Sequence, residues 1–275
     1  MFNINASDPL TGISPLIEAT LAGHAVLVER LLDLGADVDM RENRGAREMA
    51  VHKAAQLGYA AIAKILIKKS PMWTPRNMQN ESPLHLAARS GHVETIVALL
   101  PSTDDEELTS PEEDLVKSIV DVWTKFKVTP LHEACANGHL EAARLLLERG
   151  AEPDIEANYI GTPLHVAMNR GHIAIAALVL EHMDEGRSVT SEYGATLLHI
   201  AATGGHLDLV QKILSKWPTL YQVRDRYGWL PLDWARRNNH GEVMRILEDA
   251  AAADMFTSQG EEEHTARPAL KQLFC

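Results

Sequence analysis

The sequence predicts an all-α fold: a solenoid of stacked helix-turn-helix units joined by β-hairpin loops, with one insertion after the third unit. Three observations predict it. A pattern of eleven residues recurs along the chain, its copies open with residues that begin helices, and most copies close with a glycine that ends one. One such unit is too small to bury its own apolar side, so the copies are expected to stack.

Seven related stretches carry the repeat. The fourth residue of each falls at 17, 52, 85, 132, 165, 199 and 233, so the steps are 35, 33, 47, 33, 34 and 34 residues. A period near 33 runs through the chain and is interrupted once. The stretches are SPLIEATLAGH (14–24), MAVHKAAQLGY (49–59), SPLHLAARSGH (82–92), TPLHEACANGH (129–139), TPLHVAMNRGH (162–172), TLLHIAATGGH (196–206) and LPLDWARRNNH (230–240).

Each unit is expected to hold two short antiparallel helices. In the fifth copy, the hydroxyl of Thr162 can accept an unpaired backbone N–H of the first helical turn, and Pro163 has no N–H to leave unpaired. A residue in the left-handed conformation would end this helix, and Asn239 takes the place of glycine in the last copy. The second helix carries apolar residues at helical spacing, as at Leu140, Ala143, Leu146 and Leu147.

The repeat sets the expected domain boundaries. Residues 1–253 are predicted to form a single solenoid, and residues 254–275 a flexible acidic tail, because this segment combines Gly, Ser and Gln with three consecutive Glu. The repeats are expected near 8–40, 41–75, 76–101, 124–155, 156–189, 190–223 and 224–253.

The insertion is predicted to be an acidic loop followed by an extra helix, over residues 102–123. Residues 102–114 carry seven Asp or Glu and no Lys or Arg, a net charge of −7. The sequence Ser110-Pro111-Glu112-Glu113 has the form of a capping box. Apolar residues then follow at helical spacing, in the sets Leu115, Ile119, Val122 and Val116, Val120, Trp123.

These motifs resemble the ankyrin repeat family. The stretch TPLHEACANGHLEAARLLLERGAEPD (129–154) is similar to that family's pattern almost throughout, and the resemblance covers roughly residues 8–250. It implies a curved solenoid whose β-hairpin fingers and first helices form a concave face, usually used to bind other proteins. Three copies depart from the pattern: the second has Met49 and Ala50 for Thr-Pro, the sixth has Leu197 for Pro, and the seventh has Leu230 and Asp233.

Eleven of the 13 histidines fall in two columns of the repeat, and we interpret them as scaffold. A catalytic residue is needed once, whereas these recur in register. Neighbouring helices pack about 8–10 Å apart, so the repeated rings cannot converge on one zinc ion at about 2.0–2.1 Å. The resemblance implies that the first column bridges the cap hydroxyl and the adjacent turn. The columns are His52, His85, His132, His165 and His199, and then His24, His92, His139, His172, His206 and His240.

Composition excludes several classes of function. The net charge of −12 argues against nucleic acid as the main partner. The start of the chain is not a secretory signal, and its apolar runs are too short to span a membrane. Two cysteines imply no disulfide framework, so we expect a cytoplasmic or nuclear protein. The sequence contains no phosphate loop, nucleophile elbow, HExxH motif or cysteine pair, and we expect no cofactor and no metal ion.

Candidate partner-binding residues lie where the copies differ. In the resembling family, the finger tips and the ends of the first helices are exposed and variable. The candidates are Met78, Gln79, Lys125, Phe126, Lys127, Tyr159, Tyr193, Tyr227 and Trp229 on the fingers, and Arg89, Asn137, Asn169, Arg170, Arg236 and Arg237 at the helix ends. The three tyrosines recur at one finger site, where they either bind a partner or pack on the neighbouring finger.

Charge is unevenly distributed. Residues 41–90 hold nine Lys or Arg against three Glu, a net charge of +6. We hypothesise a basic half-groove that the acidic insert folds over or flanks; a solvated run of charges is the alternative.

Two functions remain open on the sequence alone. The first is a non-catalytic protein-interaction module (an adaptor, inhibitor or substrate-recognition scaffold) that holds a protein partner on its concave face; polar terminal helices are expected to keep it monomeric. The alternative is an enzyme or small-molecule binder with a pocket near residues 102–128. Its candidate residues are Glu18, Lys53, Glu133 and Asp233, with Cys135 beside Glu133 and near Lys125 or Lys127.

Overall fold

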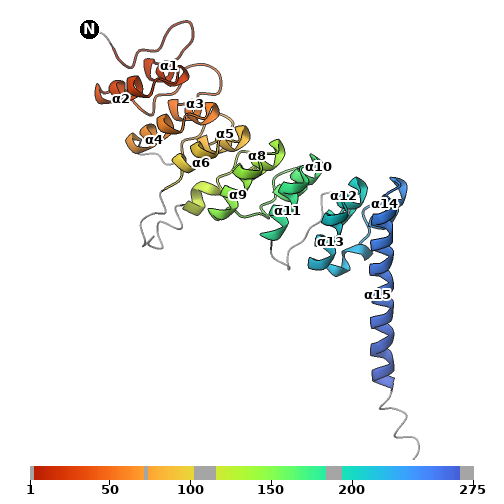
Figure 1. Ribbon diagram of the computed structural model, residues 1–275. Coiled ribbons are helices and arrows are strands. Elements are labelled where there is room, and N and C mark those ends of the chain that lie inside the picture. Colours follow the sequence, from red (N-terminus) through yellow and green to blue (C-terminus); the bar gives the residue numbers. More distant parts are fainter. Residues whose placement is uncertain (1–2, 71–73, 102–115, 184–193, 267–275) are drawn as a thin grey trace, which may run out of the picture. The chain divides into compact units, whose positions relative to one another are not determined.

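The computed structural model describes residues 3–70, 74–101, 116–183 and 194–266 (Figure 1). It divides into two compact units, Met1–Met183 and Asp184–Cys275. Each unit consists of helix pairs, and no strand longer than an isolated bridge occurs in the described ranges. This confirms the predicted all-α stack of paired helices, with loops in place of regular β-hairpins.

Unit 1 contains five helix pairs in two layers (Figure 1). Each first helix packs against the first helix of the next pair, and each second helix against the next second helix. The pairs are α1 (Pro15–Leu21) with α2 (Ala25–Asp33), α3 (Ala50–Leu57) with α4 (Ala60–Lys69), α5 (Pro83–Ser90) with α6 (Val93–Leu99), α8 (Pro130–Asn137) with α9 (Leu140–Glu148), and α10 (Pro163–Asn169) with α11 (Ile173–Glu181).

Unit 2 contains two further pairs. Helices α12 (Leu197–Gly204) and α13 (Leu207–Lys216) are followed by a short 3₁₀ helix (Pro218–Gln222), α14 (Pro231–Arg237) and α15 (Gly241–Ala266). Helix α12 packs against α14, and α13 against α15. Helix α15 continues past residue 253, where the sequence predicts a flexible tail to begin. The alanine run 250–253 and the glutamate run 261–263 both have high helix propensity.

The predicted helix boundaries have the expected local chemistry. The amide of Thr162 lies 3.4 Å from Nδ1 of His165, and the Thr162 hydroxyl lies 3.5 Å from the amide of His165. Gly138 ends α8 with φ of 79°, and Asn239 adopts φ of 62° in the last copy, as predicted for its role in place of glycine. A Cβ on Gly138 would lie 2.8 Å from the His172 ring, so this position needs glycine for space as well as for backbone conformation.

Three histidines of the first column join one repeat to the next. In His52 and His165 the buried Nε2 atom has no hydrogen-bond partner among the described residues. Nδ1 of His132 accepts the Thr129 hydroxyl at 2.8 Å, and Nε2 donates to the carbonyl of Gly161, on the following loop, at 3.1 Å. His85 and His199 repeat this bridge. Burial lowers the pKa of His132 to about 4. These rings are neutral connectors of the stack, as the resemblance implies.

Histidines of the second column pack against the preceding repeat. The rings of His92, His139 and His240 lie against the glycine that ends the previous first helix. Their Nε2 atoms donate to backbone carbonyls of that helix at 2.9–3.2 Å. Within the described ranges, no group of three or more His, Cys, Asp or Glu is arranged to hold a metal ion.

The described part of the insert begins with helical residues, 116–120. The side chains of Val116, Ile119 and Val120 are buried, as helical spacing predicts. The expectation for Trp123 is wrong, because the helical segment ends at residue 120 and the indole is 55% exposed. The capping box and the acidic run 102–114 lie outside the described residues.

Candidate functional site

The loops between helix pairs, which we call fingers, are small closed turns. In finger 3 (77–81), finger 4 (124–128) and finger 7 (225–229), the first residue's amide donates to the last residue's carbonyl at 2.9–3.0 Å. The side chain of that first residue also accepts two amide hydrogens; Asp225 Oδ1 lies 2.9 Å from the amides of Tyr227 and Trp229. This double closure holds each finger tip in one conformation.

Neighbouring fingers of unit 1 are bonded to one another. The amide of Met78 donates to the Ala46 carbonyl, and the amide of Asn158, in finger 5 (157–161), donates to the Phe126 carbonyl, both at 2.9 Å. The side-chain amide of Asn80 donates to the Trp123 carbonyl at 3.0 Å. Fingers 3, 4 and 5 therefore form a continuous row.

This row exposes large apolar side chains. Their exposed fractions run from 43% to 84%, although side chains of this kind fill the core elsewhere in the unit. We call the set the finger strip: Met78, Trp123, Phe126, Tyr159 and Ile160. The structure brings the predicted Met78, Phe126 and Tyr159 into one row. Trp123 and Ile160 were missed; Trp123 is part of a helical apolar pattern in the sequence, and only the end of the helix at residue 120 exposes it.

Polar candidates flank the strip. Gln79, Lys125 and Lys127 are exposed. Neither lysine has an ion pair within the ranges that the structure describes. The strip is therefore apolar with two unpaired positive charges at finger 4.

The candidates at the helix ends divide into two groups. Asn137, Asn169, Arg170, Arg236 and Arg237 are exposed. Arg89 instead forms ion pairs with Glu81 and, at 2.8 Å, with Glu133. The hydrogen bond with Glu133 raises the pKa of Arg89 above its ordinary value, against the effect of burial. Arg89 is thus a contact between α5, finger 3 and α8.

Arg89 closes a chain of polar contacts that we call the charge ladder. Lys53 lies 2.5 Å from Glu48 and 3.3 Å from Glu42. Asn77 Nδ2 lies 3.3 Å from Glu48 and 2.8 Å from Glu81. Burial lowers the pKa of Lys53, but Glu48 and Glu42 outweigh it, and the net effect is a raised pKa. The ladder runs along three successive repeats of unit 1. Its members are Glu42, Lys53, Glu48, Asn77, Glu81, Arg89 and Glu133.

The basic residues of segment 41–90 mostly make contacts within the chain. Arg44 donates to the Leu10 carbonyl and Arg76 to the Trp123 carbonyl, both at 2.8 Å. Arg41 bonds the Arg76 carbonyl, and Lys69 lies 3.6 Å from Asp33. Lys53, Lys69 and Arg89 are ion-paired, whereas Arg41, Arg44 and Arg76 donate to carbonyls and keep their charge. The basic half-groove stays a prediction.

Unit 2 carries a second exposed group, which we call the aromatic cluster: Tyr227, Trp229, Trp234 and Arg237. The ring centroids of Trp229 and Trp234 are 5.9 Å apart, and the Arg237 guanidinium lies 5.3 Å from the Trp229 ring. Trp234 Nε1 donates to Asp225 at 3.0 Å, which fixes the second ring. Tyr193, the third candidate tyrosine, lies outside the described residues.

Tyr159 and Tyr227, the candidate tyrosines that the structure describes, do not pack on a neighbouring finger. Tyr159 is 84% exposed and Tyr227 is 74% exposed. An aromatic ring that stiffened the row would be covered by it. These side chains are free to meet another molecule.

Three of the four acid/base candidates of the enzyme alternative, Lys53, Glu133 and Asp233, make contacts within the chain, and Glu18 is exposed. Glu133 is ion-paired with Arg89, and Lys53 with Glu48. The thiol of Cys135 is fully buried, and burial raises its pKa to about 12, so it is not a nucleophile. None of these groups lines either of the hollows found among the described residues.

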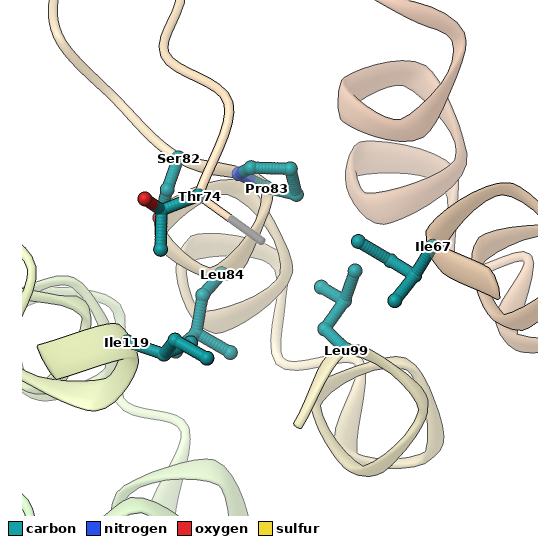
Figure 2. A pocket seen from close by; sticks show the side chains of 7 residues that line it. All are labelled: Ile67, Thr74, Ser82, Pro83, Leu84, Leu99 and Ile119. Atoms are coloured by element: carbon teal, nitrogen blue, oxygen red, sulfur yellow. The ribbon is translucent and has the colours of Figure 1, made fainter. Parts of the chain in front are cut away.

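A cavity does lie beside the insert, but it is small and apolar (Figure 2). Its volume of about 10 Å³ suits one water molecule at most. Among the described residues no carboxylate lines it; its walls are Ile67, Thr74, Ser82, Pro83, Leu84, Leu99 and Ile119. In the described part of the chain, no helix is both long enough and apolar enough to span a bilayer.

Comparison with known proteins gives a consistent result. A family model described as ankyrin repeats (3 copies) matches residues 16–110, 106–191 and 184–257. The ankyrin repeat domain of Bcl-3, a member of the IkappaB protein family, has a similar structure, with a TM-score of 0.69 and 25% identity over 86% of this chain and 99% of that chain.

Two curated relatives match about half of the chain. Inversin of Mus musculus is 30% identical over 148 residues, 53% of this chain and 13% of inversin. A probable E3 ubiquitin-protein ligase of Oryza sativa subsp. japonica, XBOS32, is 29% identical over 155 residues, 50% of this chain and 31% of the ligase. The chain therefore matches less than a third of either protein.

Proposed function

The chain belongs to the ankyrin repeat family, and from that premise we propose that it is a non-catalytic interaction module that binds a protein partner through the finger strip and the neighbouring helix ends. Ankyrin repeat domains are typically protein-interaction modules. In this chain the module serves as an adaptor, an inhibitor or a substrate-recognition scaffold. The ubiquitin-ligase name of one relative supports the third role.

The observation that carries the proposal is the finger strip itself. Five large apolar side chains, three of them aromatic, are exposed; four lie on three hydrogen-bonded fingers, and the fifth, Trp123, directly precedes finger 4. Exposing them costs free energy that a partner's apolar surface would recover. Because the tips are already held by hydrogen bonds, binding loses little conformational entropy.

The charges beside the strip indicate what the partner presents. Lys125 and Lys127 flank Phe126 and have no ion pair within the described ranges. A partner segment with apolar side chains next to Asp or Glu complements both features. The aromatic cluster of unit 2, with Arg237 held over Trp229, offers the same combination of ring and positive charge.

The test compares two double variants as bait for proteins from the native cell. Phe126→Ala with Tyr159→Ala removes the centre of the strip, and Leu57→Ala with Val97→Ala removes two exposed apolar side chains of unit 1 that lie outside it. We expect the strip variant to lose capture of a partner by about tenfold or more, while the control retains it. Both should melt near the wild-type temperature, since all four side chains are exposed.

A photo-crosslinking amino acid at position 126 or 159 then identifies the contact directly. An adduct with the captured protein from these positions, and none from position 97, supports the strip. Equal capture by the strip variant, or adducts only from position 97, would reject it.

A further inference from the structure

The aromatic cluster of unit 2 holds a positive charge that has no carboxylate partner among the residues that the structure describes. The Arg237 guanidinium lies 5.3 Å from the centre of the Trp229 ring. Asp233, one helical turn earlier in α14, does not pair with it; its Oδ2 instead accepts the amide of Leu230 at 2.9 Å. Arg237 is thus stacked on a ring, and its N–H groups are available to a ligand.

The cluster is fixed before any ligand binds. Trp234 Nε1 donates to Asp225 at 3.0 Å, and the other carboxylate oxygen of Asp225 accepts the amide of Trp229 at 2.9 Å. The Arg224 guanidinium donates to the Gly228 carbonyl at 2.7 Å, within the same finger. Because these contacts hold the rings and finger 7 in place, a ligand would bind them with little loss of conformational entropy.

The outer side of the cluster combines rings with positive charge. Tyr227 is 74% exposed and Trp229 is 37% exposed. Arg237 is exposed, as is Arg226 on the same finger, and neither forms an ion pair within the described part of the chain. The chemistry that matches this surface is an anionic group next to an apolar one.

We propose that this surface binds an acidic peptide segment of a protein partner. A Glu or Asp carboxylate of the segment pairs with Arg237, and an adjacent apolar side chain packs on Tyr227 and Trp229. A guanidinium presents parallel N–H donors to a carboxylate, and stacking on Trp229 holds this one in position. Nucleic acid matches the surface less well, because the chain's net charge of −12 repels a polyanion.

This inference rests on the proposed function only in taking the ligand to be a protein. The aromatic cluster shares no residue with the finger strip, so either surface can bind when the other does not.

The test follows the indole N–H resonances of the full chain by NMR during titration with a short peptide of alternating Glu and Phe. The same peptide with Gln in place of Glu is the uncharged comparison. We expect the Glu peptide to shift the Trp229 resonance, which Trp229→Phe identifies, and to bind about fivefold more tightly than the Gln peptide.

Two neighbouring arginines provide a matched pair of variants. Arg237→Gln should abolish the preference for the Glu peptide. Arg236→Gln should keep it, because Arg236 is also exposed but already lies 3.8 Å from both Asp233 and Glu248. Both variants should melt near the wild-type temperature, since both side chains are exposed.

Trp123 reports on the finger strip in the same titration. A Trp229 shift that is lost in Arg237→Gln and kept in Phe126→Ala with Tyr159→Ala supports the proposal, whatever happens at Trp123. A shift of Trp123 alone would reject this site and leave the strip in place.

Three further results would overturn the proposal. The first is equal binding of the two peptides at Trp229, or no shift of Trp229 up to about 1 mM Glu peptide. The second is an equal loss in Arg236→Gln and Arg237→Gln. The third is a single-stranded oligonucleotide that shifts Trp229 at lower concentration than the Glu peptide does, which would point to nucleic acid instead.

Discussion

Histidine has one role in each column of this chain, and its protonation state follows from that role. Four first-column rings accept a cap hydroxyl at Nδ1, and His52 accepts the amide of Met49 there instead. In His85, His132 and His199 the Nε2 atom also donates to a carbonyl. A proton on Nδ1 would replace the acceptor by a second donor and place a charge in the core. The neutral ring is therefore part of the fold.

This predicts that stability falls with acidity in a defined range. Burial lowers the pKa of four first-column histidines of unit 1 from 6.5 to about 4: His52, His85, His132 and His165. A folded pKa below the unfolded one means that the unfolded chain takes up the proton first. The contribution of these rings to the free energy of unfolding is therefore fully present above pH 6.5. It declines towards pH 4, by at most about 1.4 kcal/mol per pH unit for each ring.

Urea unfolding followed by circular dichroism at several pH values measures this slope. In the variant His132→Gln the free energy of unfolding should change less steeply with pH, because the unfolded chain takes up one proton fewer. A free energy of unfolding that is constant between about pH 7 and pH 5 would contradict the account.

At the scale of helices and loops, polar side chains of different repeats hold one another. Arg89 lies in the last turn of α5, and its two ion-pair partners come from finger 3 and α8. If Arg89 turned towards a partner, Glu81 and Glu133 would each lose their ion pair with it. The sequence names Arg89 as a candidate for partner binding. In the structure its guanidinium instead connects two neighbouring repeats.

A double-mutant cycle tests that role. Arg89→Ala and Glu133→Ala should each destabilise the fold, with a coupling free energy of about 1 kcal/mol, because both groups are partly withdrawn from water and hydrogen-bonded. The pair Lys69 and Asp33 is the control; its side chains are 53% and 52% exposed and its atoms 3.6 Å apart, so coupling should be near zero. Urea unfolding measures both cycles, and equal couplings would argue against a distinct role for Arg89.

At the scale of the whole molecule, the chain is a series of small cores rather than one. Each of the two compact units has its own buried residues, such as Leu131 and Leu164 in the first and Leu198 and Val210 in the second. In stacked repeats, each unit is stabilised by its neighbours, so damage stays local.

The effect of Asp225→Ala tests this locality. Asp225 accepts hydrogen bonds from two backbone amides and from Trp234. Burial raises its pKa, but these hydrogen bonds outweigh it and the pKa is lowered. Losing this acceptor should cost about 2 kcal/mol. Hydrogen exchange should then speed up in residues 194–253 and stay unchanged in unit 1; the exposed Asp208→Ala is the control.

Faster exchange throughout both units would mean that the chain unfolds as one. Unchanged exchange in residues 194–253 would mean that the finger closure does not stabilise unit 2.

Much of the candidate surface was predictable from the sequence, because exposure of a finger tip depends on its place in the repeat. Phe126 and Tyr159 could be named for that reason, and the structure leaves both exposed. Trp123 could not, since its place in an apolar helical pattern hides where the helix ends. The surface's function as a binding site stays a prediction.

The sequence by itself determined the paired helices of the repeats, the ends of their first helices and the histidine columns, because these depend on residues within one repeat and the pattern recurs seven times. Only the tertiary structure decided which side chains meet across repeats, as Arg89 and Glu133 do, and which apolar side chains stay exposed, as Trp123 does. Those outcomes depend on residues about one repeat or more away along the chain, whose approach no local pattern specifies.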